Sequence, residues 1–104
     1  MSIMDRRLQL QALLSGIPGV KKVYFQEPSA DMMEYPCIIY HLDKRESIHA
    51  DNTPYRHSKR YQVTVIDRNG VSSIPDDVAK LPLCAFDRRF EASKLYHDVF
   101  NLYF

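Results

Sequence analysis

The first seventeen residues follow the period of an amphipathic helix. Their apolar residues recur at steps of seven, four and three positions: Ile3, Leu10, Leu14 and Ile17. Ser2 followed by Asp5 is typical of a capped helix start, because the hydroxyl accepts a backbone N–H and the acid lies near the positive end of the helix dipole. Gly16 and Pro18 are typical of a helix end. The pattern therefore predicts a helix over about residues 2–15.

Five later segments have the length and composition of β-strands. Strands are rich in β-branched and aromatic residues, and a half-buried strand alternates apolar and polar positions. The alternation is clearest where Tyr61, Val63 and Val65 fall on one face, while Ile66 departs from it. The predicted strands cover residues 20–25, 37–42, 59–68, 83–91 and 95–104.

The segments between the strands carry helix and turn signals. Pro75 followed by acidic residues predicts a brief helix that runs to about Leu81 and ends at Pro82. Residues 49–54 are polar and turn-prone, which predicts a mobile loop. Residues 92–94 have the length of a hairpin loop between the last two strands.

Together these elements predict an α+β fold in the order α-β-β-β-α-β-β. We expect a mainly antiparallel mixed sheet of about five strands, with two helices packed against it. The length of 104 residues suits a single domain over residues 1–104. A content of 45% hydrophobic and 26% charged residues is typical of a globular domain and argues against disorder throughout the chain.

The charge balance and the cysteines exclude several classes of protein. Fourteen basic and 13 acidic residues give a net charge of +1, which lacks the basic excess of a sequence-independent nucleic-acid binder. Asp5, Arg6 and Arg7 interrupt the N-terminal apolar pattern, so we expect no signal peptide, no membrane span and a cytosolic protein. Cys37 and Cys84 each lie in an apolar run, which indicates buried, reduced thiols and not a zinc site.

The candidate catalytic and metal-binding residues form no known signature. His41, His49 and His57 are eight residues apart, which would place them on a strand, in a loop and at a strand entrance. His97 and Asp98 are neighbours in a strand and therefore face opposite ways. No glycine-rich phosphate loop and no nucleophile motif is present. We therefore predict a protein that is not an enzyme and that uses no metal and no cofactor.

Surplus apolar, aromatic and basic residues are candidates for a contact between subunits. Met4, Leu8 and Ala12 form a second helical stripe, which fits either a wide core face or a subunit contact. The residues 56–61 form the densest basic patch. The chain has twelve aromatic residues, and four of them lie in the last predicted strand; such a number is difficult to bury in one small core. The candidate interface residues are Met4, Leu8, Arg56, Arg60, Tyr96, Phe100 and Phe104.

Three segments carry a resemblance to a known family. Residues 35–40 (YPCIIY), 61–67 (YQVTVID) and the ending 97–104 (HDVFNLYF) resemble the tail terminator, or tail-to-head joining, proteins of long-tailed bacteriophages, and the similarity covers nearly the whole chain. The resemblance implies an α+β subunit of a ring, usually a homohexamer, that caps the tail tube. It also implies a virion protein assembled in the cytoplasm of a bacterial host.

The partners follow from the same resemblance. They are further copies of the chain, the tail tube protein and the head connector, with no membrane and no specific nucleic acid, although DNA passing through the ring is compatible with it. One alternative is a head-completion protein that sits on the connector. A second alternative is a small nucleic-acid-binding module built on Arg56, Lys59, Arg60 and Tyr61. A third is a hydrolytic enzyme that uses His41 and His97.

Overall fold

Seven helices and strands make up the described chain. The computed structural model describes the backbone of residues 3–26, 29, 33–50 and 53–104, and the side chains of residues 7–26, 29, 33–42 and 60–104. No helix in this part of the chain is long and apolar enough to cross a membrane. The elements are α1 (Ile3–Ser15), β1 (Lys22–Phe25), β2 (Cys37–Ala50), β3 (Thr53–Asp67), α2 (Ile74–Ala79), β4 (Cys84–Ala92) and β5 (Leu95–Tyr103).

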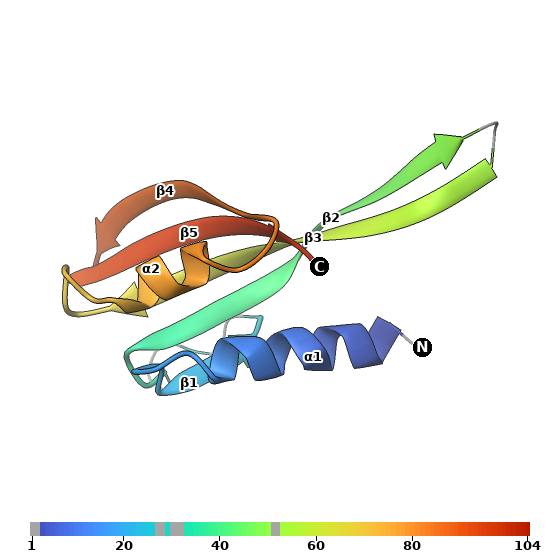
Figure 1. Ribbon diagram of the computed structural model, residues 1–104. Coiled ribbons are helices and arrows are strands. Elements are labelled where there is room, and N and C mark those ends of the chain that lie inside the picture. Colours follow the sequence, from blue (N-terminus) through green and yellow to red (C-terminus); the bar gives the residue numbers. More distant parts are fainter. Residues whose placement is uncertain (1–2, 27–28, 30–32, 51–52) are drawn as a thin grey trace.

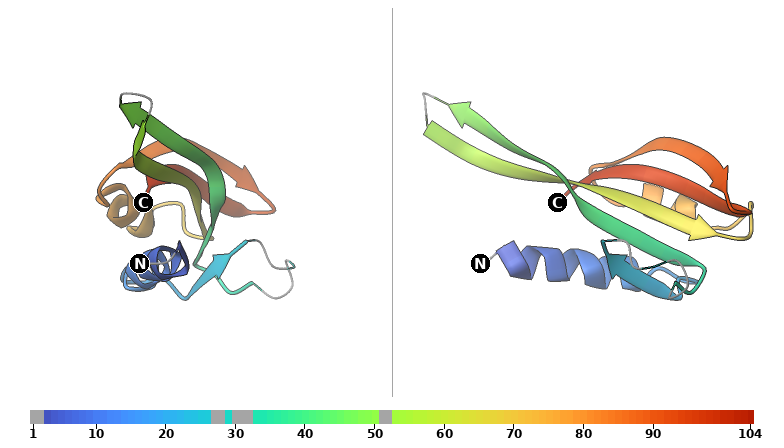
Figure 2. Two further views of the ribbon diagram at one scale, coloured as in Figure 1. Left: turned by 90° about the vertical axis from the view of Figure 1, so that its right-hand side faces the viewer. Right: turned by 180° about the vertical axis from the view of Figure 1, so that it is seen from behind.

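The five strands form one mixed sheet, and the predicted α+β fold is confirmed. The strand order is β1-β2-β3-β5-β4; β1 runs parallel to β2, and the other neighbours are antiparallel. α1 and α2 lie along the same side of the sheet (Figure 1). In the view from behind, β4 and β5 lie in front of α2 (Figure 2). The predicted order of helices and strands is the observed one.

The main core lies between the helices and the sheet. Tyr40 is its largest fully buried side chain, and its hydroxyl donates a hydrogen bond of 2.5 Å to Gln11 Oε1 on α1. This bond satisfies the polar end of a ring that otherwise packs among apolar groups. The buried core residues are Leu10, Leu14, Ile17, Ile38, Tyr40, Tyr61, Val63, Val65, Ile74, Val78, Phe100 and Leu102.

A second, smaller cluster covers part of the opposite face of the sheet. Cys37, Ile39 and Ile66 form its buried centre, with Tyr24, Met33, Tyr35 and Leu95 packed against it. Ile66 departs from the alternation of its strand because it belongs to this second cluster, while Val63 and Val65 belong to the main core. Because both faces of the sheet are covered here, the first residues of β2 are apolar on both sides of the strand.

The β4–β5 hairpin closes as the sequence predicts. Its two turn residues, Ser93 and Lys94, have φ angles of 53° and 64°. Positive φ at both turn positions matches the right-handed twist of the flanking strands. The β4–β5 pairing shifts between Phe86 and Arg88, which leaves Asp87 in an irregular position.

Residues 44–50 and 53–59 form a two-stranded arm, where the sequence predicted the end of one strand, a loop and the start of the next. The β3–β5 ladder begins at Arg60, while β2 and β3 stay paired from Lys44↔Arg60 to Ala50↔Thr53. The predicted loop over residues 49–54 is therefore wrong at its two ends, and residues 51–52 lie outside the described residues. The arm leaves the body of the domain (Figure 1), and the chain measures 50 × 24 × 23 Å.

Candidate functional site

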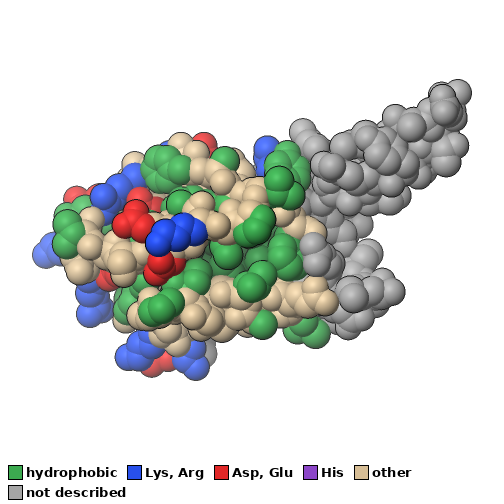
Figure 3. Space-filling view, in the orientation of Figure 1, with side chains coloured by type: hydrophobic (Ala, Val, Ile, Leu, Met, Phe, Trp, Pro, Cys, Tyr) green, Lys and Arg blue, Asp and Glu red, His purple; other side chains and the backbone are tan. Residues whose placement is uncertain are grey.

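An apolar groove lies between α1, the segment that joins α2 to β4, and the C-terminal end of β5. Its volume is about 320 Å³. Figure 3 shows hydrophobic side chains gathered in this region, between α1 and the connection that leads into β4. The groove is lined by Leu10, Leu13, Leu81, Pro82, Leu83, Leu102, Tyr103 and Phe104. A lining of this composition favours apolar contact with another molecule over chemistry on a polar substrate.

The floor of the groove is part of the core, but its rim is exposed. Leu10 and Leu102 are buried beneath it, while Leu13 is 47% exposed and Leu83 is 72% exposed. Leu83 also has a φ of 58°, in the left-handed region that side chains other than glycine occupy at a cost of about 1–2 kcal/mol. Its carbonyl is held by the N–H of Tyr103 at 3.1 Å. The domain therefore keeps a strained leucine in contact with solvent.

Two of the three residues in the second apolar stripe on α1 are exposed. Leu8 is 50% exposed, and Ala12 is exposed as well. The interpretation of this stripe as a wide core face is therefore wrong at these positions, because the core uses the side of α1 that carries Leu10 and Leu14. Leu8 remains available for a subunit contact. The side chain of Met4 lies outside the described residues.

The three aromatic interface candidates lie in three different environments. Phe104 is half-buried and lines the apolar groove. Phe100 is 2% exposed and packs edge to face on Phe86, with ring centroids 5.5 Å apart, so it belongs to the core and offers no surface to a partner. Tyr96 is half-buried beneath the Arg89 guanidinium, which lies 4.8 Å from its ring centroid. The structure therefore does not gather these three residues into one patch.

The basic candidates lie at the base of the arm and within it. Arg60 is half-buried where the arm joins the sheet, and its register partners are Lys44 and Tyr103. The side chain of Arg56 lies outside the described residues.

Sequence reasoning missed Leu13 and Leu83 at the rim of the groove. Leu83 directly follows Pro82, but this order carries no signal for a left-handed, exposed leucine.

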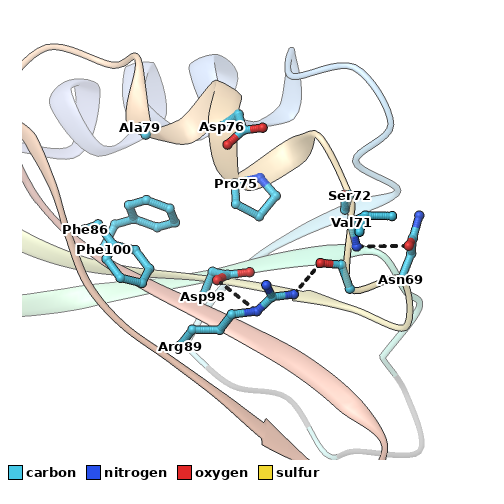
Figure 4. Close-up of a pocket in the computed structure, with 11 residues that line it drawn as sticks. Asn69, Val71, Ser72, Pro75, Asp76, Ala79, Phe86, Arg89, Asp98 and Phe100 are labelled. Carbon is cyan, nitrogen blue, oxygen red and sulfur yellow. Dashed lines mark hydrogen bonds and ion pairs between the residues drawn. The ribbon is translucent and has the colours of Figure 1, made fainter.

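A second cavity, more polar than the groove, holds the buried carboxylate of Asp98 (Figure 4). It has a volume of about 500 Å³ and lies between α2, the turn that follows β3, and strands β4 and β5. Asp98 is 7% exposed, and its Oδ1 lies 3.5 Å from Nε of Arg89. His97 faces the other way, as predicted: its ring stacks on Phe90 at 4.6 Å. His97 and Asp98 therefore do not act together as an acid–base pair.

The thiols and histidines provide no further chemical centre in the described part of the chain. Cys37 and Cys84 are not joined in a disulfide. Burial raises the pKa of the Cys84 thiol, which disfavours the nucleophilic thiolate. Among the residues whose side chains are described, no group of three or more His, Cys, Asp or Glu residues could hold a metal ion. This part of the chain includes His41 and His97, while the side chains of His49 and His57 lie outside it.

Replacing Asp98 with asparagine is expected to remove a pH-dependent cost to stability. Burial raises the pKa of the Asp98 carboxyl, and Asp76 raises it further, while the positive charges of Arg89 and His97 oppose the rise. The folded chain therefore binds this proton more tightly than the unfolded chain does, and the contribution of Asp98 to stability falls as the pH rises above its ordinary pKa of 3.8.

The measurement is the free energy of unfolding between about pH 3 and about pH 7, the range in which carboxyl groups titrate. The difference between Asp98→Asn and wild type should shift in favour of the variant as the pH rises, and then level off. Asp77→Asn is the control, because Asp77 pairs with Lys80 on the protein surface. A difference that shifts in favour of wild type would mean that the folded state lowers the pKa of Asp98.

Comparison with known proteins identifies no relative. The chain matches no protein-family model, no curated protein and no solved structure. Its function must therefore be argued from its own geometry.

Proposed function

We propose that this protein is an assembly subunit that joins further copies of itself in a closed ring, and that it serves as a tail terminator of a long-tailed bacteriophage. The observation that carries the proposal is the apolar groove with Leu13 and Leu83 exposed at its rim. Within one chain, neither the exposure nor the backbone strain at Leu83 is compensated by a contact that buries its side chain. A neighbouring subunit seated on the groove would provide that burial.

Burial of the exposed rim leucines would stabilise a contact between subunits. Burying a fully exposed leucine stabilises a complex by about 1.5–3 kcal/mol, and a partly exposed leucine contributes in proportion to its exposed area. Two such residues, Leu13 and Leu83, lie on the same groove. Phe104 adds an aromatic side chain of the kind that is enriched at the centres of interfaces. The groove therefore suits a small, apolar centre of an interface, surrounded by polar surface.

The arm provides a second argument for assembly. A two-stranded ribbon without a sheet or helix beside it is marginally stable in water. Residues 44–50 and 53–59 extend past the β3–β5 ladder, which begins at Arg60. An arm of this kind gains stability when it lies on the surface of a neighbour. Arm and groove are different surfaces, and a contact between two different surfaces repeats around a closed ring when its rotation closes.

The assignment to a tail terminator adds the resemblance of residues 35–40, 61–67 and 97–104 to that family. In this function a ring, usually of six copies, caps the tail tube and ends its growth, because its outer face does not reproduce the surface of the tube. The partners are the tail tube protein and the head connector. The protein is a virion component that is assembled in the cytoplasm of the bacterial host. A head-completion ring on the connector is the alternative, and it differs in which partner the ring binds.

Shortening the arm is expected to give a folded protein that no longer forms rings. Glu46 and Ser58 are register partners, so residues 47–57 can be replaced by Asn-Gly, which closes a hairpin at that point. Light scattering of the full chain should give the mass of a closed oligomer, and electron micrographs should show rings that bind to the ends of purified tail tubes. The shortened chain should have the mass of a monomer, and its circular dichroism spectrum should still show a folded sheet.

Two outcomes would contradict the proposal. The first is a full chain that stays monomeric at every concentration and beside tail tubes. The second is a shortened chain that forms the same oligomer as the full chain, which would remove the arm from the contact. A ring that binds purified connectors and not tail tubes would assign the protein to head completion.

A further inference from the structure

The cavity around Asp98 is built from four separated segments of the chain. α2 forms one wall, the turn of residues 69–72 a second, and strands β4 and β5 form the remaining walls (Figure 4). Its volume of about 500 Å³ falls within the range of sites that hold small ligands. The apolar groove described above has a different lining and shares no residue with it.

The charged groups that line the cavity are unbalanced. Asp76 and Asp98 are the two carboxylates and Arg89 is the single guanidinium, so the lining carries one net negative charge. Arg89 and Asp98 do not form a bidentate ion pair. Nε of Arg89 lies 3.5 Å from Oδ1 of Asp98, while Nη2 donates to the carbonyl oxygen of Gly70 at 2.6 Å. Within the described residues, no hydrogen bond or ion pair engages the carboxylate of Asp76. The cavity therefore has room for one more positive charge.

Several backbone donors in and beside the adjacent turn are already engaged. The N–H of Val71 donates to Oδ1 of Asn69 at 3.1 Å, and the N–H of Ser72 donates to the carbonyl oxygen of Asn69 at 3.4 Å. The N–H of Ile74 donates to Oγ of Ser72 at 3.2 Å. These N–H groups already have acceptors, while the carboxylates of the lining can still accept hydrogen bonds. The lining therefore suits a ligand that donates hydrogen bonds and disfavours an anion.

One side of the cavity is aromatic. Phe86 and Phe100 stand edge to face with ring centroids 5.5 Å apart, and both line the cavity opposite the turn (Figure 4). Phe86 is 57% exposed, so ring surface remains for a ligand. An aromatic face attracts a cation and also packs against methylene groups. Pro75 and Ala79 add apolar surface from α2.

We propose that this cavity binds an ammonium or guanidinium group on a short alkyl stem, with Asp98 and Asp76 receiving the cation and the exposed Phe86 ring contacting the stem. A buried carboxylate that is incompletely neutralised gains most from such a partner. The same chemistry is present in a free diamine and in a lysine or arginine side chain of a second copy of the chain. The site does not depend on the proposed role in tail assembly.

The test uses agmatine, which carries a guanidinium and an ammonium group on one alkyl stem. Binding is followed by NMR shifts of the full-length protein at constant ionic strength, with pentanol as a neutral probe and glutarate as an anionic probe. We expect saturable shifts around Asp98 with agmatine and none with the two other probes. Asp98→Asn and Asp76→Asn should each weaken agmatine binding by about tenfold, because a charge-assisted hydrogen bond is lost.

Asp77→Asn is the matched control, because Asp77 is on the same helix, pairs with Lys80 and does not line the cavity. It should leave agmatine binding unchanged. Asp76 is exposed, so Asp76→Asn keeps the test valid if Asp98→Asn perturbs folding. The proposal is overturned if agmatine gives no saturable shifts, if glutarate binds equally well, or if both cavity variants bind agmatine as wild type does.

Light scattering with and without agmatine distinguishes the two sources of the cation. A mass that agmatine does not change, together with saturable shifts, identifies a site for a free small molecule. A mass that falls as agmatine saturates the site identifies a lysine or arginine side chain of a neighbouring copy as the natural occupant. Both outcomes support the cation site, and a failure of ring formation alone leaves the NMR result standing.

Discussion

The double replacement Leu13→Asp and Leu83→Asp is expected to convert the assembled protein into folded monomers. Both leucines lie on the rim of the apolar groove and are 47% and 72% exposed, so aspartate at these positions is well solvated in the single chain. In an interface that covers the groove, each carboxylate would lose its water without gaining a partner. Loss of a central apolar anchor costs about 2 kcal/mol or more, which is about thirtyfold in the dissociation constant.

The measurement is the mass in solution over a range of concentrations, with circular dichroism to show that the fold is kept. Phe90→Asp is the control, because Phe90 is 41% exposed and lines neither the groove nor the cavity around Asp98. It should leave the oligomer intact. An unchanged mass for the double variant would remove the groove from the subunit contact.

Leu83→Gly separates backbone strain from burial at the same position. Glycine adopts the φ of 58° without the steric cost that leucine bears, so the single chain should be as stable as wild type or more stable. Assembly should nevertheless weaken, because the exposed side chain is gone. A variant that is less stable and assembles normally would show that Leu83 serves the fold of the single chain.

The order of the elements could be predicted from the sequence because each element with a buried face carries its own period. The N-terminal segment shows steps of four and three residues because Leu10 and Leu14 of α1, and Ile17 just after it, belong to the core. The inner half of β3 alternates because Val63 and Val65 face the helices. The arm could not be predicted in the same way. Residues 44–50 and 53–59 extend beyond the other strands, and their sequences lack the regular apolar alternation that indicates a half-buried strand.

The groove could be predicted less well, because it is assembled from distant parts of the chain. Leu13 comes from the first helix, Leu83 from the segment after α2, and Phe104 from the end of the chain. Of these, only Phe104 was among the predicted interface residues. The left-handed backbone at Leu83 has no sequence signal, since no glycine or asparagine occupies the position.

The aromatic residues of β5 show how strand position decides between core and surface. β5 lies between β3 and β4, and both Val99 and Phe100 are buried although they face opposite sides of the sheet. An excess of aromatic residues in this strand indicated an interface, yet Phe100 fills the core beneath the helices. The edge strand β4 carries the exposed aromatic residues instead, with Phe86 at 57% and Phe90 at 41%.

Phe100→Ala is therefore expected to destabilise the single chain and not to act on assembly. Removing a buried phenylalanine costs about 3–5 kcal/mol, because the transfer of the ring from water is lost and a cavity remains. A domain of this size has a total stability of about 5–15 kcal/mol, so the variant should unfold at a much lower urea concentration than wild type. Phe86→Ala is the matched control, since its ring is the edge-to-face partner of Phe100 but is 57% exposed.

The comparison of the two variants distinguishes a core residue from an interface residue. Phe86→Ala should cost about 0.5–1.5 kcal/mol, the strength of the aromatic pair, because little buried area is lost with it. If Phe100 were an anchor between subunits, Phe100→Ala would leave the urea midpoint of the monomeric Leu13→Asp, Leu83→Asp background unchanged and would lower only the mass of the wild-type assembly. A large shift of the midpoint in that monomeric background is the expected result, because Phe100 is buried by its own chain before any neighbour binds.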